Sequence, residues 1–111
     1  MPGPAAYTYF TEQGKGAPSW KNEVTLRSVE MFTEYEPGSY IAFVSPTPLM
    51  FVVALGDHLT VADEALAAYG RALEPKRLVM LKGGHFDAYV ADFDASSSAA
   101  AAWFAEHLGR V

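Results

Sequence analysis

The stretch of residues 50–85 constrains the fold of this sequence more than any other. A continuous apolar run, residues 49–55, leads to Asp57, and a second run, residues 77–81, leads through a glycine pair to His85. Short apolar runs bounded by turn residues are typical of buried strands, and the longer amphipathic segment between them is typical of a helix. The stretch therefore predicts two parallel strands joined by a helix.

Chain geometry predicts where the two polar turns lie. Parallel strands joined by a helix have a right-handed crossover, which brings both strand C-termini to one edge of the sheet. That edge is where ligands bind in open α/β sheets. We therefore expect Asp57 and His85 to meet as an acid–histidine pair, in which Asp57 orients the imidazole and His85 acts as a general base. A nucleophile would complete such a site.

Three segments combine helical spacing of apolar residues with capping or stop residues. They are residues 20–35 after the cap Ser19, the segment from the cap Thr60 to Pro75, and a last helix that begins at Ser96 or Ser97 and stops at Gly109. For residues 40–44 we predict a short extended segment. Residues 1–19 lack a sustained period and predict an arm or loop, which leaves residues 20–111 as a single partial α/β domain.

The predicted sheet is incomplete. Two strands do not form an independently stable parallel sheet. Unpaired strand edges and large apolar faces also favour association. We therefore expect the sheet to be completed by another copy of the chain or by a second chain.

Composition excludes several classes of function. The net charge of −5 disfavours a nucleic-acid partner, which requires clustered basic residues. The sequence has 0 cysteines, so disulfides, thiolate zinc sites and a cysteine nucleophile are excluded. The apolar runs are far shorter than the roughly 20 residues of a membrane span, and the N-terminal residues do not resemble a secretory signal. We expect a soluble, cytoplasmic protein without a membrane partner.

Three parts of the sequence together resemble the C-terminal portion of α/β-hydrolases: residues 48–60, 72–78 and 83–89. The resemblance is greatest to the dienelactone-hydrolase-like and Xaa-Pro-peptidase-like branch, and it covers roughly residues 20–108. It implies that Asp57 is the acid of a catalytic triad, in a turn of the D-x-x-T-P type, and that His85 is the triad histidine. Val61 stands where this turn usually has proline.

The nucleophile of that family has no counterpart in this sequence. It normally lies in a G-x-S-x-G turn upstream of the acid, and the oxyanion hole depends on the same turn. No such motif occurs here. The resemblance therefore implies the acid-and-histidine half of a serine hydrolase for a small-molecule ester or acyl bond, inactive alone, either as a fragment or as a half that pairs with a nucleophile-bearing chain. The alternative is a non-catalytic α/β module that self-associates as a homodimer.

Other interpretations of the polar residues have less support. His58 is adjacent to Asp57, but neighbouring side chains at a strand end diverge, so we expect it to face solvent. A metal site built from His58, Asp57, His85 and Asp87 would have suitable ligand types without any recognised metal-binding spacing. The glycine pair before His85 matches no phosphate-binding motif and predicts a tight turn. No metal or cofactor is expected.

Overall fold

The computed structural model describes residues 3–109. The chain divides into two compact units, residues 1–39 and residues 40–111. The boundary predicted between arm and domain, after residue 19, lies inside the first unit. The outer ends of the predicted arm and domain, residues 1–2 and 110–111, lie outside the described residues.

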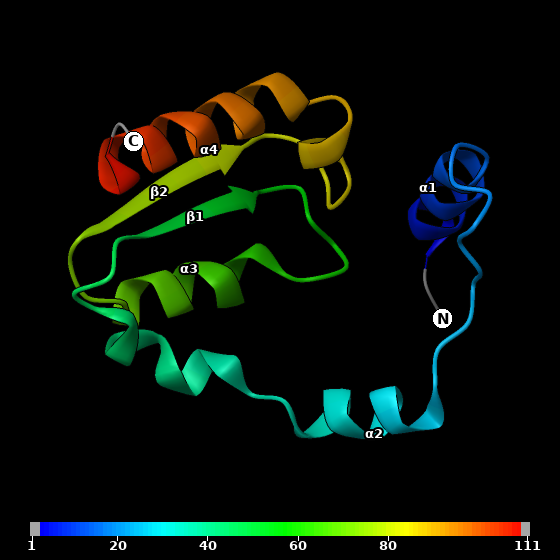
Figure 1. The fold of residues 1–111 in the computed structure, drawn as a ribbon, viewed down its shortest axis with the longest axis horizontal. Coiled ribbons are helices and arrows are strands. Elements are labelled where there is room, and N and C mark those ends of the chain that lie inside the picture. The colour runs from blue at the N-terminus through cyan, green and yellow to red at the C-terminus, as the bar shows by residue number, and fades with distance from the viewer. Residues whose placement is uncertain (1–2, 110–111) are drawn as a thin grey trace. The chain divides into compact units, whose positions relative to one another are not determined.

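The second unit contains a two-stranded parallel sheet, as predicted (Figure 1). Its strands pair in register from Leu49 opposite Lys76 to Ala54 opposite Leu81. The sheet is not closed. The elements that form this unit, with the 3-10 helix that leads into it, are η1 (Pro37–Val44), β1 (Leu49–Ala54), α3 (Ala62–Arg71), β2 (Lys76–Leu81), η2 (Asp87–Tyr89) and α4 (Phe93–Leu108).

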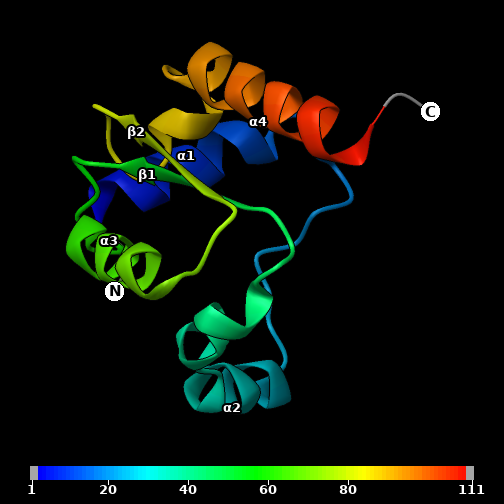
Figure 2. The same cartoon turned by 90° about the vertical axis from the view of Figure 1, so that its left-hand side faces the viewer.

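Helices α3 and α4 cover opposite faces of this sheet (Figures 1 and 2). Phe51 of β1 packs against Tyr69 of α3 with ring centroids 5.9 Å apart. On β2, Arg77 lies over the Trp103 ring of α4, 4.7 Å from its centroid. Arg77 is paired with Met50, and adjacent strand residues such as Met50 and Phe51 point to opposite faces. The alternation of side chains therefore places one helix on each face.

The first unit contains two α-helices, α1 (Pro4–Gly14) and α2 (Leu26–Glu34). The prediction of an arm or loop is wrong for residues 4–14, so residues 3–109 hold four α-helices and not three. Pro4 at the start of α1 has its backbone angle preset for a helix. Phe10 of α1 stacks on Trp20, with ring centroids 5.9 Å apart. This contact between residues distant in sequence stabilises a helix that shows no clear apolar period.

Capping residues shift two of the other predicted helices. Helix α2 starts later than predicted because its cap is Thr25, whose side chain accepts a hydrogen bond from the Ser28 amide at 3.1 Å. Helix α4 starts earlier than predicted, after Asp92. Ser96 lies inside α4, where its hydroxyl donates to the carbonyl of Ala88 at 2.6 Å. Both cap predictions, Ser19 and Ser96 or Ser97, are therefore wrong.

Two further predictions concern chain segments between the strong elements. The segment 40–44 is not extended, since it belongs to the 3-10 helix η1. The predicted stop of the last helix is confirmed, because α4 ends where Gly109 adopts a φ of 73°. That angle lies in the left-handed region, which glycine adopts without steric cost.

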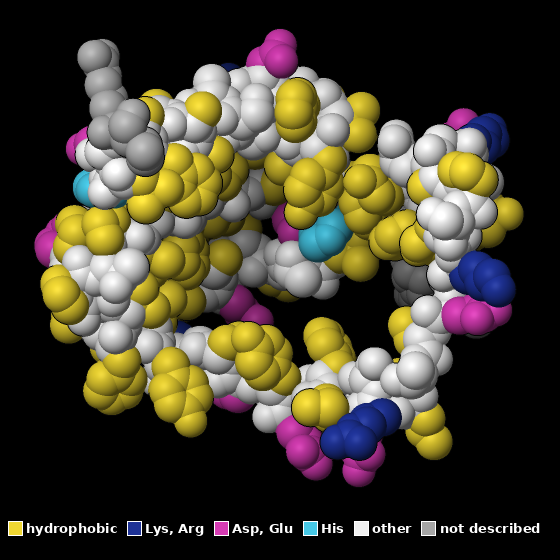
Figure 3. Space-filling model, viewed as in Figure 1, with side chains coloured by type: hydrophobic (Ala, Val, Ile, Leu, Met, Phe, Trp, Pro, Cys, Tyr) yellow, Lys and Arg dark blue, Asp and Glu magenta, His cyan; other side chains and the backbone are white. Residues whose placement is uncertain are grey.

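The hydrophobic core is small. The buried apolar side chains among residues 3–109 are Ala6, Val53, Ala62, Ala72, Leu81 and Trp103. Large apolar side chains remain exposed even on regular elements, as Met80 of β2 does with 59% of its surface accessible. Figure 3 shows such hydrophobic side chains at the molecular surface. Within the described part of the chain, no helix is both long and apolar enough to cross a membrane.

Candidate functional site

The two predicted site residues lie in the turns that follow β1 and β2. A backbone hydrogen bond joins these turns, because the amide of Gly56 donates to the carbonyl of Gly83 at 2.9 Å. The approach is close: a Cβ on Gly56 would lie 2.9 Å from the same carbonyl oxygen. Glycine at this position therefore allows the turn of Asp57 to lie against the turn of His85.

The structure brings Asp57 and His85 into direct contact. Nδ1 of His85 lies 2.8 Å from Oδ2 of Asp57. The Asp57 side chain is 10% exposed and the His85 side chain 30% exposed. The acid is thus largely shielded, while the imidazole is partly accessible. The edge of the His85 ring also meets Phe86, with ring centroids 4.7 Å apart.

The carboxylate of Asp57 is held by its own turn. Oδ1 accepts the backbone amides of Leu59 at 2.8 Å and Thr60 at 3.0 Å. Oδ2 accepts the Thr60 hydroxyl at 2.6 Å, in addition to its contact with His85. The prediction that Thr60 caps α3 is wrong, since the residue before that helix is Val61. The three-residue spacing from Asp57 to Thr60 was the sequence signal for this contact.

These hydrogen bonds determine the charge of Asp57. Burial raises the pKa of its carboxyl group, and this effect is opposed by hydrogen bonds from the Thr60 side chain, from His85 and from the backbone amides of Thr60 and Leu59. The net result is a pKa well below the usual range. Asp57 is therefore an anion that can stabilise positive charge on His85.

This lowered pKa predicts an acid-dependent loss of stability. In the unfolded chain the Asp57 carboxyl has a pKa of about 3.9, and in the folded chain its pKa is lower. Its contribution to the free energy of unfolding is therefore complete above the unfolded pKa and is lost as pH falls toward the folded pKa. We expect urea midpoints to fall less between pH 7 and pH 3 in Asp57→Asn than in the wild type. An equal fall of the urea midpoint in the two proteins would contradict the lowered pKa of Asp57.

The turn that carries His85 is shaped by two further carboxylates. The amide of Gly84 donates to Oδ2 of Asp87 at 2.6 Å, and the amide of Gly83 donates to Oδ2 of Asp92 at 3.2 Å. Asp87 is therefore engaged with the backbone. Across residues 3–109 there is no group of three or more His, Cys, Asp or Glu side chains that could hold a metal ion. His58, at the next position after Asp57, is exposed.

A serine that could be activated does not lie beside the pair in the second unit. The hydroxyl groups of its serines all donate to backbone carbonyls; these residues are Ser45, Ser96, Ser97 and Ser98. The hydroxyl that approaches His85 is that of Thr60, 3.2 Å from Nδ1. Because this is the nitrogen that faces Asp57, Thr60 does not occupy the position of a nucleophile at Nε2. The second unit thus places a carboxylate and an imidazole in contact.

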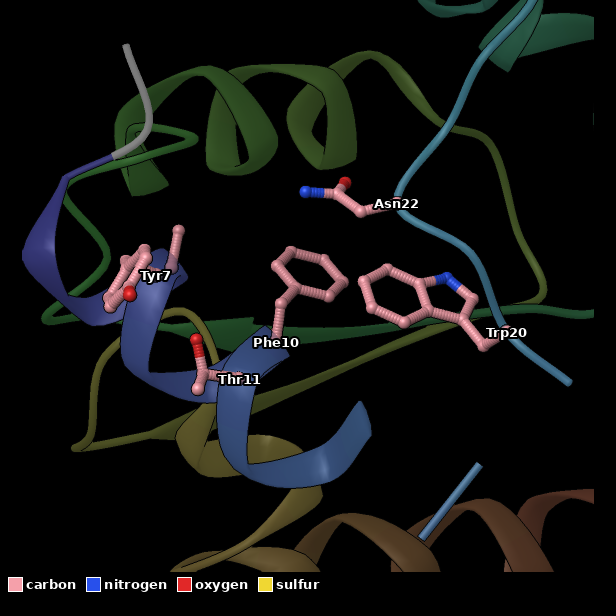
Figure 4. Close-up of a pocket in the computed structure, with 6 residues that line it drawn as sticks. Tyr7, Phe10, Thr11, Trp20 and Asn22 are labelled. Carbon is pink, nitrogen blue, oxygen red and sulfur yellow. The ribbon is translucent and has the colours of Figure 1, made fainter. Parts of the chain in front are cut away.

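The first unit has a separate cavity of about 260 Å³ (Figure 4). Its lining residues are Ala6, Tyr7, Phe10, Thr11, Trp20 and Asn22. Aromatic rings dominate this lining, and it contains no carboxylate, lysine, arginine or histidine. The cavity therefore offers a mainly aromatic binding surface without the acid–histidine pair of the second unit.

Comparison with known proteins gives partial matches to longer relatives. No protein-family model matches the sequence, and no solved structure does. The uncharacterized protein YfhR of Escherichia coli is 39% identical over 56 residues, which is 50% of this chain and 20% of YfhR. A thiohydrolase of Eupenicillium brefeldianum is 28% identical over 74 residues, 66% of this chain and 24% of the relative.

A polyketide transferase of Gibberella fujikuroi is 33% identical over 75 residues, 67% of this chain and 23% of the relative. The matched segment is therefore less than a quarter of the length of each of these curated relatives. The names of two of them describe hydrolase-like or acyl-handling proteins. At this level the chain is similar to proteins of that kind.

Proposed function

We propose that this chain carries the acid-and-histidine portion of a serine α/β-hydrolase that cleaves an ester or acyl bond. The contact of 2.8 Å between Nδ1 of His85 and Oδ2 of Asp57 carries the proposal. Both residues lie in the turns that follow adjacent parallel strands, at the edge where α/β sheets bind ligands. The resemblance to the dienelactone-hydrolase-like branch and the similarity to a thiohydrolase support the same reaction class.

In this proposal, His85 carries out the proton transfers, and Asp57 orients and stabilises it. Nε2 of His85 takes the proton from a serine hydroxyl as its oxygen attacks the acyl carbon, and the imidazolium then returns that proton to the leaving group. Asp57 holds Nδ1 and stabilises the imidazolium through its negative charge. A water molecule, activated by the same nitrogen, releases the acyl group from the serine. An ester or a thioester fits this sequence of steps.

The serine and the oxyanion hole come from a segment or a second chain that carries the G-x-S-x-G turn. This sequence lacks that turn, and more than three quarters of each longer relative lies outside the match. The unpaired outer edge of a two-stranded sheet is a suitable contact for such a segment.

A covalent probe tests whether the nucleophilic serine lies outside this chain and depends on His85. We expect a fluorophosphonate to leave the purified chain unmodified, as measured by intact mass. When the chain is expressed together with a segment that carries a G-x-S-x-G turn, we expect the probe to label the serine of that turn. His85→Ala should lower that labelling by about a thousandfold or more, whereas His58→Ala, the matched control, should leave it unchanged.

Two results would contradict the proposal. An adduct on the 111-residue chain itself would identify an activated serine within these residues. Equal labelling in the presence of wild-type chain and His85→Ala would show that His85 is not the base.

The alternative function is a non-catalytic module that self-associates. The exposed Met80 on β2 and the open sheet favour this alternative. Sedimentation of the purified chain over a range of concentrations discriminates between the two. A monomer at every concentration would exclude a homodimer, and a concentration-dependent dimer whose mass does not change on adding a nucleophile-bearing partner would favour the alternative.

A further inference from the structure

We infer that Thr60 is a positioning residue, whose hydroxyl holds the Asp57 carboxylate so that His85 carries its proton on Nδ1 and leaves Nε2 free to act as a base. The inference rests on the proposed function, because it assigns a role within the same acid–histidine pair. It is carried by three short contacts among Thr60, Asp57 and His85 in the second unit.

The carboxylate of Asp57 has little rotational freedom. The amides of Leu59 and Thr60 occupy Oδ1, and the Thr60 hydroxyl donates to Oδ2 at 2.6 Å. Without the hydroxyl bond, the carboxylate could rotate about its Cβ–Cγ bond and move Oδ2 away from the imidazole. The hydroxyl prevents this rotation by holding the second oxygen. Oδ2 is thus kept at the position from which it meets Nδ1 of His85.

The same contacts select one tautomer of neutral His85. An ionised carboxylate only accepts hydrogen bonds, so a separation of 2.8 Å between Oδ2 and Nδ1 requires the proton to lie on Nδ1. The single hydroxyl proton of Thr60 is used on Oδ2, which leaves an oxygen lone pair 3.2 Å from Nδ1. That lone pair accepts from the same Nδ1 proton.

In the opposite tautomer, with the proton on Nε2, two acceptors, Oδ2 of Asp57 and Nδ1 of His85, would compete for the single hydroxyl proton of Thr60. Two favourable contacts would be lost and lone pairs would face one another. The hydroxyl therefore contributes to the free-energy difference between the tautomers, and the favoured tautomer is the one with a basic Nε2.

The test is the tautomer ratio of His85 in the full chain, measured from the ¹⁵N shifts of its ring nitrogens at alkaline pH. Wild type should show a protonated Nδ1 and an unprotonated Nε2. Thr60→Ala removes the hydroxyl without adding bulk and should lower the ratio roughly fivefold to tenfold, the effect of one net hydrogen bond. Thr60→Ser should restore it. Thr47→Ala, at an exposed threonine of the same unit, is the control.

Each outcome has a distinct meaning. An unchanged ratio in Thr60→Ala, or a ratio in Thr60→Ser as low as in Thr60→Ala, would overturn the positioning role while leaving the acid–histidine pair intact. A wild-type ratio equal to that of Asp57→Asn would instead show that the pair, and with it the proposed function, is wrong. If Thr60→Ala does not fold by circular dichroism, the test is the side-chain rotamer of wild-type Thr60, measured from three-bond couplings. A single rotamer that directs the hydroxyl toward Asp57 supports the inference, whereas averaging over several rotamers overturns it.

Discussion

Trp103→Ala is expected to remove a large part of the stability of the second unit. Trp103 is 6% exposed and is the only large ring among the buried apolar side chains of residues 3–109. It connects the sheet to α4 through Arg77 of β2, which lies 4.7 Å from the centroid of its ring. Within α4, the His107 ring also lies 3.9 Å away between centroids. Truncation of a buried tryptophan to alanine costs about 3–5 kcal/mol. The whole free energy of unfolding of a small domain is about 5–15 kcal/mol.

Urea unfolding followed by far-UV circular dichroism measures this loss. The matched control is Phe104→Ala, at the next position of α4, where the side chain is 59% exposed. We expect Phe104→Ala to change the free energy of unfolding by about 1 kcal/mol or less. Equal destabilisation by the two substitutions would show that Trp103 does not form the centre of this core.

Gly83→Ala is expected both to destabilise the second unit and to separate His85 from Asp57. A Cβ at Gly83 would lie 2.5 Å from Cβ of Asp87 and 2.7 Å from Oδ2 of Asp92. Cβ of Asp87 cannot move away by side-chain rotation, so the backbone of the turn must shift. Overpacking of this kind costs about 1–3 kcal/mol.

The measurement combines the urea midpoint with the ring ¹⁵N shifts of His85, which report the loss of its contact with Asp57. Gly70→Ala is the control, since a Cβ at Gly70 would meet nothing within 4 Å. Alanine is favoured over glycine inside a helix, so this control should stabilise the chain by up to about 1 kcal/mol. A Gly83→Ala protein with wild-type midpoint and unchanged His85 shifts would contradict the structural role of Gly83.

The strands, their parallel pairing and the proximity of Asp57 to His85 were predictable because they depend on general rules. Apolar runs of strand length form buried strands, and the crossover between parallel strands places the turns after them at one edge. Neither rule requires knowledge of side-chain packing. The contact between Asp57 and His85 could therefore be predicted without a nucleophile in the sequence.

Helix boundaries were less predictable because capping residues have several possible partners. Thr60 has the residue type and position of a helix cap. In the folded turn, however, its hydroxyl donates to the carboxylate of Asp57, and Val61 is the residue before α3. Helix α1 shows no clear apolar period, and its position is stabilised by the stacking of Phe10 on Trp20. Neither contact can be predicted from local helix propensity.

The sequence by itself determined the two parallel strands with a helix between them, the edge of the sheet at which Asp57 and His85 lie, and the lack of a G-x-S-x-G turn. Only the tertiary structure decided which hydroxyl completes the carboxylate's hydrogen bonds, because Thr60 can reach Asp57 only after the turn has folded. It also decided how closely the two turns approach. That distance depends on the absence of a Cβ at Gly56, together with the hydrogen bond from the Gly56 amide to the carbonyl of Gly83.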